Sequence, residues 1–416
     1  MGKLQKEILL KDFTYIASLI FIVFMLNACA QISEQPRPKN ITFALLSEVT
    51  PERINNSLKN AAEWLLSNQN PDGSLKYVYY PASRRFSSQN NVLRQFMATI
   101  ALDEYYNYSG NVSYSQAFRK NLDYNLKTYY VQDGSIGHIY FDNTSKLGAA
   151  AFAIISIARL NSGDYNNYLT SLTNLVYHLH NADGSFQTFY IPESLNTNQY
   201  FYPGETMLAL MVLYEKTHDK RYIDTVKQSF DFYQDYYRKK MNPAFIPWMS
   251  MATYKLYKET GDGNYSSYIF EINDWLLQIQ NKKCDAPERL GEFYAPEHPE
   301  YGPPHAASTG IYIEGLSYAY ALAKELNDTG RMESYKEAIL LGTRSQLQLQ
   351  FSEDEASARS DARFVLGGIR TSTSNSAIRI DNNQHTIMAF INVGRVLSAE
   401  DIAAFTNAHP EYNCLS

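Results

Sequence analysis

A turn signature, Asn70-Pro71-Asp72-Gly73-Ser74-Leu75, separates two amphipathic segments near the start of the chain. Related versions return as Gln132-Asp133-Gly134-Ser135-Ile136 and Ala182-Asp183-Gly184-Ser185-Phe186, each between two further amphipathic segments. Glycine supplies the positive φ of such a turn and the Asp or Ser side chain bonds its amides, so we interpret the turns as structural. A unit repeated about every 40–60 residues predicts an array or a closed ring, because one helical hairpin cannot bury its apolar face alone.

The segments between the turns alternate between two kinds of predicted helix. Segment 52–68 carries a single apolar stripe, with Ile54, Leu58 and Leu65 at helical spacing, which is typical of a helix packed on one side. Segment 90–106 is apolar around most of its circumference, which is typical of a buried helix. The outer kind is predicted at 52–68, 113–129, 164–180, 219–236, 265–280 and 332–349, and the inner kind at 90–106, 146–160, 204–217, 246–259, 307–325 and 384–397.

Strict alternation of six outer and six inner helices predicts an all-α fold, an (α/α)6 toroid built from six helical hairpins. Small residues lie near the starts of the predicted inner helices, at Gly148, Gly204, Gly310 and Gly315. Glycine allows close approach of helix backbones, which is needed where helices converge on a common axis. A single toroid domain over residues 46–416 is expected, because no linker rich in Pro, Gly or Ser interrupts the helical pattern.

The first 30 residues are typical of an export signal. Lysines precede an uncharged apolar run at 16–26, which has signal-peptide length and is shorter than the roughly 20 residues that span a bilayer. Leu26-Asn27-Ala28-Cys29 is similar to a bacterial lipobox, whose cysteine is lipidated after cleavage. We predict a signal peptide with lipobox over 1–28, a tether over 29–45, and an exported protein anchored to the cell membrane through lipidated Cys29. An uncleaved N-terminal anchor is the alternative.

Composition limits the partners of the chain. The net charge of −6 comes without a basic stripe, so we expect no nucleic acid partner. The chain has 34 tyrosines and 3 tryptophans, and a tyrosine ring with its hydroxyl suits a sugar-binding cleft, although it also fills ordinary helix interfaces. Cys284 and Cys414 either pair in one disulfide, as an exported protein allows, or remain isolated thiols.

The chain resembles several groups of helical toroids. Its Asp-Gly-Ser turns before inner helices are similar to those of the terpenoid cyclase, prenyltransferase and α2-macroglobulin-like toroids. The broader plan resembles the (α/α)6 glycoside hydrolases, polysaccharide lyases and glucuronyl C5-epimerases. The likeness covers nearly all of residues 46–400 and implies the architecture much more than the chemistry. No catalytic signature of these families matches a stretch of this sequence, so no functional residue is carried over.

In such a ring, the segments that lead into the inner helices gather at one mouth, where a pocket is expected. Glu205 lies in the first turn of a predicted inner helix beside Tyr202, and burial would make it a general acid or base. The helix dipole alone also favours a glutamate there. Glu314 lies inside an otherwise apolar helix, where a carboxylate needs a partner or a raised pKa, so it either acts in catalysis or bonds a neighbouring loop. His298 and His305 are interpreted as loop surface.

The last repeat carries the strongest constellation. Arg379 and Asp381 share one side of an extended segment, and His385 follows about one helical turn after Asp381. Together these types of residue could bind a carboxylated sugar and move a proton. The alternative is an Asp381 helix cap, a buried His385 and an Arg379 that satisfies another carboxylate. The predicted catalytic residues are Asp381, His385, Glu205 and Glu314, and the predicted substrate-binding residues are Arg379, Arg370, Tyr202, Trp248, Tyr301 and Tyr312.

Several motifs that would indicate a particular reaction or cofactor are absent from the sequence. The sequence has no Asp-x-Asp-Asp run of a protonating terpene cyclase, no cysteine and histidine spacing of a zinc site and no phosphate-binding glycine loop, so we predict no metal and no cofactor. The leading function is a carbohydrate-active enzyme on an extracellular or envelope polysaccharide, working by hydrolysis with two carboxylates or by elimination or epimerisation of a uronate. The alternative is a non-catalytic surface lipoprotein that binds a glycan or a protein partner. Arg84, Arg85 and Arg94 face either an anionic ligand or solvent.

Overall fold

The structure, a computed structural model, describes residues 44–160 and 162–414. The predicted signal peptide, and the predicted tether up to residue 43, lie outside the described residues. The described residues up to Ser372 and from Ser376 onward belong to one compact unit, which holds the helices discussed below. Within the described ranges, no helix has both the length and the apolar character to cross a membrane.

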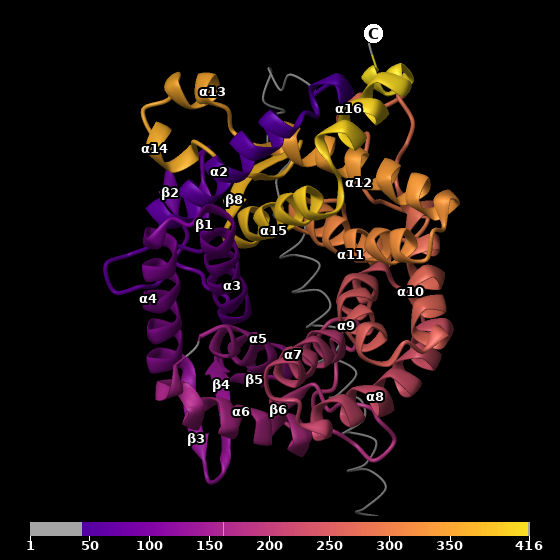
Figure 1. Ribbon diagram of the computed structural model, residues 1–416. Helices are drawn as coiled ribbons and strands as arrows, with labels where there is room; N and C mark the ends of the chain where they lie inside the picture. The colour runs from indigo at the N-terminus through magenta and orange to yellow at the C-terminus, as the bar shows by residue number, and fades with distance from the viewer. Residues whose placement is uncertain (1–43, 161, 415–416) are drawn as a thin grey trace, which may run out of the picture. The chain divides into compact units, whose positions relative to one another are not determined.

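Six helices of the described ranges surround a common axis and form the inner helices (Figure 1). They are α3 (Val92–Ser109), α5 (Leu147–Ala158), α7 (Tyr202–Thr217), α9 (Ile246–Thr260), α11 (Ala306–Glu325) and α15 (Ile380–Val396). Each inner helix packs against the next along the chain, and α15 packs against α3, which closes the ring. Most of their residues are buried, so the removal of apolar surface from water stabilises the closed ring.

A second set, the outer helices, surrounds the inner ring (Figure 1). They are α2 (Pro51–Ser67), α4 (Val112–Tyr129), α6 (Asn166–Leu179), α8 (Lys220–Lys239), α10 (Gly263–Leu276) and α12 (Thr329–Leu349). Helices α4 to α12 of this set each pack on the inner helix that precedes them, whereas α2 packs on the last inner helix, α15. The first outer helix therefore joins the two ends of the ring. The alternation of outer and inner helices is confirmed.

Short strands, which the all-α prediction did not include, build two small sheets in the described part of the chain. One sheet has the order β2-β1-β8-β7 and the other β3-β4-β5-β6. Strand β1 pairs antiparallel with β8, with Val78 opposite Arg379, so the segment before the first inner helix is joined to the segment before the last. The strands are β1 (Val78–Tyr80), β2 (Arg85–Phe86), β3 (Tyr130–Asp133), β4 (Ile136–Phe141), β5 (Thr144–Lys146), β6 (Phe189–Ile191), β7 (Arg370–Ser372) and β8 (Asn375–Arg379).

The remaining elements are short helices in the connecting segments and at the C-terminal end. The α-helical ones are α13 (Glu353–Ser357), α14 (Ala362–Val365) and α16 (Ala399–Ala408). The 3-10 helices are η1 (Leu46–Glu48), η2 (Gly163–Tyr165), η3 (Pro243–Phe245), η4 (Leu277–Ile279), η5 (Pro287–Arg289), η6 (Pro299–Tyr301) and η7 (Pro410–Asn413). 3-10 helices rarely run longer than a few residues, and here they act as short connectors between the longer helices.

The first quoted turn docks onto the backbone of an outer helix. Asp72 accepts hydrogen bonds from the backbone N–H of Ser74 at 3.0 Å and from its hydroxyl at 2.7 Å. Gly73 has a φ of +97°. A Cβ at Gly73 would lie 2.2 Å from the carbonyl oxygen of Lys120 in α4, so glycine is required both for the conformation and for the contact.

The same docking recurs at Gly184 on α8, at Gly291 on α12 and at Gly367 on α2. Gly134 of the second quoted turn differs, because it lies between the paired strands β3 and β4 with open space around it. The Asp-Gly-Ser signature therefore identified two of these docking turns. It missed the turns at Gly291 and Gly367, whose neighbours have other side chains.

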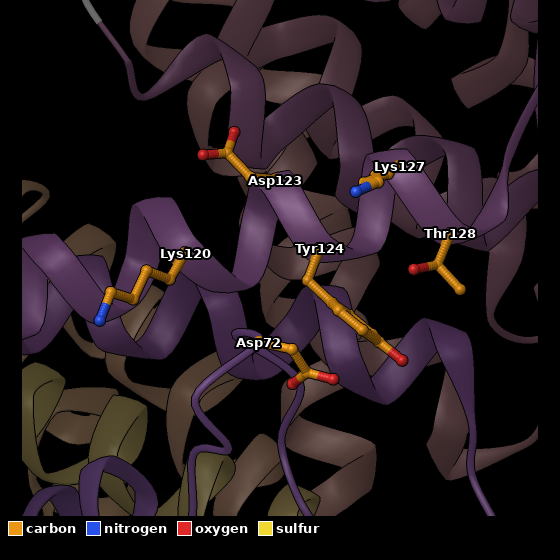
Figure 2. Close-up of a pocket in the computed structure, with 6 residues that line it drawn as sticks. All are labelled: Asp72, Lys120, Asp123, Tyr124, Lys127 and Thr128. Atoms are coloured by element: carbon orange, nitrogen blue, oxygen red, sulfur yellow. The ribbon is translucent and has the colours of Figure 1, made fainter.

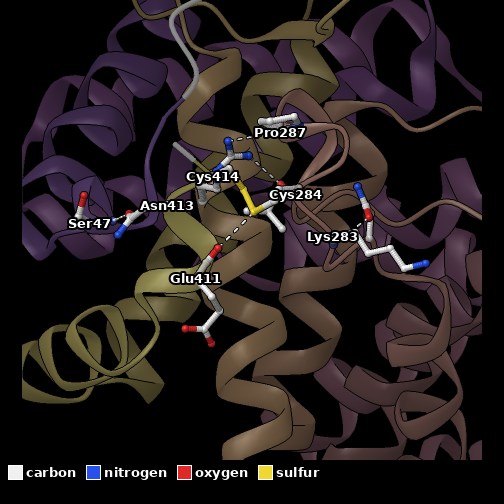
Figure 3. Close-up of a disulfide and its surroundings, with 10 residues drawn as sticks. Ser47, Lys283, Cys284, Pro287, Glu411, Asn413 and Cys414 are labelled. Carbon is white, nitrogen blue, oxygen red and sulfur yellow. Dashed lines mark hydrogen bonds between the residues drawn. A yellow bond between two sulfur atoms is a disulfide. The ribbon is translucent and has the colours of Figure 1, made fainter. Parts of the chain in front are cut away.

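A disulfide joins Cys284 to Cys414, which confirms one of the two alternatives expected from the sequence (Figure 3). It connects the segment after α10 to the end of the described chain. The neighbouring Asn413 side chain accepts a hydrogen bond of 2.9 Å from the backbone N–H of Ser47. The first and the last described segments are thereby fastened to the same part of the ring.

Candidate active site

The inner helices all run in the same direction, because each is followed by a short turn into an outer helix or, for α15, into α16. Their N-terminal ends and the longer segments that lead into them therefore meet at one end of the ring, which we call the mouth. Their C-terminal ends meet at the other end, which we call the collar. The predicted site residues lie in the first halves of the inner helices or in the segments that lead into them, so they belong to the mouth end.

Glycines near the mouth set the positions of two functional side chains. A Cβ at Gly310 of α11 would lie 2.8 Å from the Cβ of His385 on α15. A Cβ at Gly204 of α7 would lie 2.7 Å from the Cβ of Trp248 on α9. Non-bonded carbon atoms prefer separations of about 3.5–4.0 Å, so any larger residue at either glycine would displace the imidazole or the indole. The close approach of the inner helices that the sequence predicted is confirmed.

A buried pair of a carboxylate and an imidazole joins two inner helices. The Nδ1 atom of His385 on α15 lies 2.8 Å from Oε1 of Glu314 on α11, and the two side chains are 7% and 3% exposed. Burial raises the pKa of Glu314, and the hydrogen bond to His385 opposes that rise. A carboxylate that accepts the Nδ1–H proton leaves Nε2 of the imidazole with its lone pair. His385 can therefore accept a proton at Nε2 and return it.

A cavity of about 230 Å³, the axial chamber, lies among the inner helices and is lined by Glu314 of this pair. Its lining residues come from all the inner helices and from the end of α5: Met97, Ile100, Glu104, Phe152, Ile155, Arg159, Leu208, Val212, Glu215, Trp248, Met251, Lys255, Glu314, Tyr318, Gln384 and Met388. Trp248 lies in the first turn of α9, with its ring centroid 6.3 Å from His385 and 5.3 Å from Phe152. An aromatic face thus lies beside the acid–base pair at the mouth end of the chamber.

Two arginines hold Asp381 at the start of α15. Arg379 donates to both carboxylate oxygens, at 2.9 and 2.7 Å, and Nε of Arg94 on α3 lies 2.8 Å from Oδ2. Burial alone would raise the pKa of Asp381, but the charges of Arg379 and Arg94 outweigh it and lower the pKa to about 2. Asp381 is therefore ionised at neutral pH. Both of its oxygens are bound by arginines, so the carboxylate holds these two side chains in position.

Glu205 is a second buried carboxyl group near the mouth. It is 2% exposed and its Oε2 atom has no hydrogen-bond partner. Burial raises its pKa well above the usual range. A Cβ at Gly148 of α5 would lie 2.2 Å from that oxygen, so the carboxyl group is packed against the neighbouring helix. Tyr202, three residues earlier, is buried against Phe189. A carboxyl group that keeps its proton to higher pH can act as a general acid.

His305, which the sequence placed at the surface, instead caps α11. Its Nδ1 atom accepts a hydrogen bond of 3.1 Å from the backbone N–H of Ser308. Burial and the charge of Arg379 lower the pKa of His305 to about 4. The surface prediction for His305 is wrong because the ring is needed as the helix cap and is covered by its neighbours. The prediction for His298, whose side chain is 48% exposed, is confirmed.

Three predicted substrate-binding residues have other partners. The guanidinium of Arg370 in β7 bonds Glu355 at 2.6 Å. Tyr312 on α11 is buried, with its ring centroid 5.1 Å from that of Phe293. The ring of Tyr301 in η6 stacks on the imidazole of His298 rather than on an inner helix. The structure thus gathers the predicted catalytic residues and three of the six predicted binding residues, which are Arg379, Tyr202 and Trp248, around the mouth.

The sequence left open whether Arg94 faces a ligand or solvent, and it did not point to Gln384 at all. Arg94 lies in the first turn of an inner helix that is apolar nearly all round, and a charge in such a helix signals a buried partner. Gln384 lines the axial chamber next to His385, with Nε2 3.3 Å from Nδ1 of the imidazole. The sequence does not distinguish Gln384 from Asn382 and Asn383, because all three carry an amide side chain. In the structure Asn382 and Asn383 bond backbone groups.

A larger hollow of about 480 Å³ lies along the outer helix α4 (Figure 2). It is lined by Asp72, Lys120, Asp123, Tyr124, Lys127 and Thr128. The Asp72 carboxylate serves the docking turn, and Asp123 accepts a hydrogen bond from Tyr165. Size favours this hollow, but chemistry favours the axial chamber, which brings buried titratable groups together. Within residues 44–160 and 162–414, no group of three or more His, Cys, Asp and Glu is arranged to hold a metal ion.

Comparison with known proteins defines the fold. Among solved structures, the chain is similar to a D-mannose isomerase, with a TM-score of 0.61, 13% identity, and coverage of 83% of this chain and 97% of that chain. It is also similar to a cellobiose 2-epimerase from Bacillus thermoamylovorans B4167, with a TM-score of 0.60, 11% identity, and coverage of 82% and 98%. The fold is that of an (α/α)6 toroid.

A third similar structure is an α-1,6-mannanase from Salegentibacter sp. HEL1_6, with a TM-score of 0.57, 11% identity, and coverage of 83% of this chain and 99% of that chain. The toroid therefore extends over nearly the whole length of each neighbour, at identities that support the fold alone. No protein-family model and no curated protein sequence matches the chain.

Proposed function

We propose that this toroid is a carbohydrate-active enzyme that transfers protons at its mouth, with His385 as the acid–base and Glu314 as the residue that orients it. The observation that carries the proposal is the 2.8 Å hydrogen bond between buried Glu314 and His385, beside the ring of Trp248. An aromatic face next to polar groups suits a sugar ring. The solved neighbours, which include an isomerase, epimerases, a glucuronyl hydrolase and a mannanase by name, support a carbohydrate as substrate.

Proton transfer fits the contacts better than hydrolysis does. Hydrolysis needs two carboxyl groups on either side of one glycosidic bond, one of them ionised and free to attack or to activate water. Asp381 is ionised but bound by two arginines, and Glu314 is bound by His385. Glu205 can supply an acid, but the contacts give it no free ionised partner.

His385 can act on a carbon-bound proton next to a carbonyl group. Nε2 takes the proton, and the electron pair of the broken C–H bond moves into the carbonyl to give an enolate. If the bound enolate then turns its other face toward Nε2, the imidazolium returns the proton there and the result is epimerisation. If a leaving group departs instead from the adjacent carbon, the result is elimination. Glu314 stabilises the imidazolium through its hydrogen bond to Nδ1, as an orienting carboxylate does in other acid–base pairs.

Solvent deuterium incorporation tests the reaction. The full-length chain is incubated in deuterium oxide with a panel of neutral and uronate polysaccharides and oligosaccharides, and the products are examined for deuterium, unsaturation and new reducing ends. With the wild type we expect carbon-bound deuterium if the reaction is epimerisation, or an unsaturated end if it is elimination. Either product should fall by about 10²- to 10⁴-fold in His385→Ala. New reducing ends with neither deuterium nor unsaturation would contradict proton transfer and indicate hydrolysis. Glycan binding without any product would indicate the non-catalytic binding protein.

The proposed substrate is an extracellular or envelope polysaccharide, and the proposed location is the cell membrane, through lipidated Cys29. The apolar run and Leu26-Asn27-Ala28-Cys29 support export and lipidation, and the disulfide between Cys284 and Cys414 suits an oxidising compartment. Metabolic labelling with a fatty-acid probe in a bacterial host tests the anchor. We expect the label to be lost in Cys29→Ala, and label that persists in this variant would contradict lipidation at Cys29.

A further inference from the structure

The axial chamber presents hydrogen-bond acceptors next to the proposed acid–base pair. Gln384 is 4% exposed, lines the chamber, and has no partner for its side-chain oxygen. Glu314 lines the same end of the chamber and gives one of its oxygens to His385. A carboxylate has about four acceptor positions, so Glu314 can accept further hydrogen bonds. A buried acceptor without a donor costs free energy, which a ligand with donor groups would recover.

Within the described part of the chain, the carboxylate of Glu314 has no lysine or arginine as an ion-pair partner. Its partner is an imidazole, which carries no charge while Nε2 holds its lone pair. The arginines nearest the mouth, Arg94 and Arg379, are both bound to Asp381. The cations at the far end of the chamber have partners as well: Arg159 with Asp103 and Glu104, Arg395 with Glu104, and Lys255 with Glu215.

The size and walls of the chamber fit one ring. A cavity of roughly 150 Å³ holds a benzene molecule, so about 230 Å³ holds a single six-membered ring with its substituents. Trp248 and Phe152 form an aromatic wall at the mouth end, and an aromatic face attracts both the C–H face of a sugar and a nearby cation.

We infer that the axial chamber accepts one amine-bearing sugar ring, whose ammonium group donates to Glu314 and Gln384 and whose ring packs against Trp248. An ammonium group offers three donors and one positive charge, which complement these acceptors. A uronate would instead place a second carboxylate beside Glu314. Arg370 and Arg379, the arginines that the sequence suggested for a uronate, are bound to Glu355 and Asp381. The inference rests on the proposed function and narrows its substrate class.

Binding of three matched sugars tests the inference without requiring turnover. The full-length chain is titrated by calorimetry with methyl glucosaminide, methyl glucoside and methyl glucuronide. We expect the glucosaminide to bind about tenfold more tightly than the glucoside, and the glucuronide to bind most weakly, because a hydrogen bond to a charged group is worth more than a neutral one. Glu314→Gln should remove the preference for the amine, and Gln384→Ala should reduce it.

A matched control lies at the collar end of the same helix. Glu325 on α11 is bound to Lys258 and Tyr254, and Glu325→Gln should leave the order of the three sugars unchanged. In Trp64→Phe/Trp275→Phe, Trp248 is the only one of the chain's 3 tryptophans that remains, so its fluorescence reports occupancy of the chamber directly.

The outcomes separate the inference from the proposed function. Equal binding of the glucosaminide and the glucoside, or tighter binding of the glucuronide, would overturn the inference and leave proton transfer by His385 intact. Failure of all three sugars to bind, with deuterium incorporation from polysaccharide still present, would also overturn the inference alone. Failure of both binding and deuterium incorporation would overturn the inference together with the proposed function.

Discussion

The mouth and the collar of the inner ring are built from the same helices and differ in how completely their buried polar groups are paired. At the collar, Glu104 is bound to Arg159 and to Arg395, the latter at 2.7 Å. Burial raises the pKa of Glu104, but the two arginines outweigh it and the net shift is downward. At the mouth Asp381 is likewise bound by two arginines, but Oε2 of Glu205 and the side-chain oxygen of Gln384 have no hydrogen-bond partner among the described residues. Paired charges stabilise the collar, whereas unpaired buried groups cost stability and are typical of a site that acts on a ligand.

The largest expected effect is on activity at the mouth. Glu314→Gln replaces the acceptor of the His385 Nδ1–H with an amide, which can donate to Nδ1 and favour the tautomer that has no lone pair on Nε2. We expect deuterium incorporation to fall about 10²- to 10⁴-fold with little loss of folding free energy. The pH dependence of the rate should shift as well. Full activity in this variant would show that His385 does not depend on Glu314.

The corresponding change at the collar should act on stability. Arg159→Met leaves Glu104 and Asp103 without one of their buried partners. We expect the free energy of unfolding to fall by about 3–5 kcal/mol, measured by urea denaturation. Arg395→Met, at a side chain that is 52% exposed, should cost much less. A loss of less than about 1 kcal/mol in Arg159→Met would show that the paired charges of the collar do not stabilise it.

A pH-dependent effect is expected from His305. Its pKa is near 4 in the folded protein and near 6.5 in the unfolded chain. The unfolded state therefore binds more protons between these values, so stability is fully present above pH 6.5 and falls as the pH drops toward 4. His305→Asn keeps a capping side chain, and we expect it to remove about 2 kcal/mol of this pH dependence. Parallel denaturation curves for wild type and variant across this range would contradict the assignment.

The smallest expected effect is at the exposed part of the collar. Lys258 bonds Glu325 at 3.1 Å, with a side chain that is 50% exposed. Solvent and salt screen such pairs, so Lys258→Met should change the free energy of unfolding by less than about 0.5 kcal/mol. A larger loss, measured by urea denaturation, would show that the ion pairs of the collar act as one network rather than separately.

The helices of the fold were predictable because their apolar residues recur with a clear period. The difference between segments 52–68 and 90–106 separated outer from inner helices, as the structure confirms. The two sheets were not predictable, because strands such as β2 (Arg85–Phe86) are too short to show an alternating pattern. Their pairing depends on the closed ring, which brings β1 next to β8.

The sequence predicted which residues belong to the site better than it predicted the contacts between them. Glu314 and His385 stood out as polar residues in apolar inner helices, which a single sequence can show. Their hydrogen bond joins residues 71 positions apart and depends on the close approach at Gly310, which no local pattern encodes. The engagement of Arg379 and Arg94 with Asp381 is likewise a property of the folded ring.

A crystal structure of the full-length chain with a bound oligosaccharide tests the central claim, that the mouth is the active end, most directly. The account predicts a sugar ring against Trp248 with an atom in hydrogen-bonding distance of Nε2 of His385. Sugar found only in the hollow along α4, or only at the collar, would contradict it.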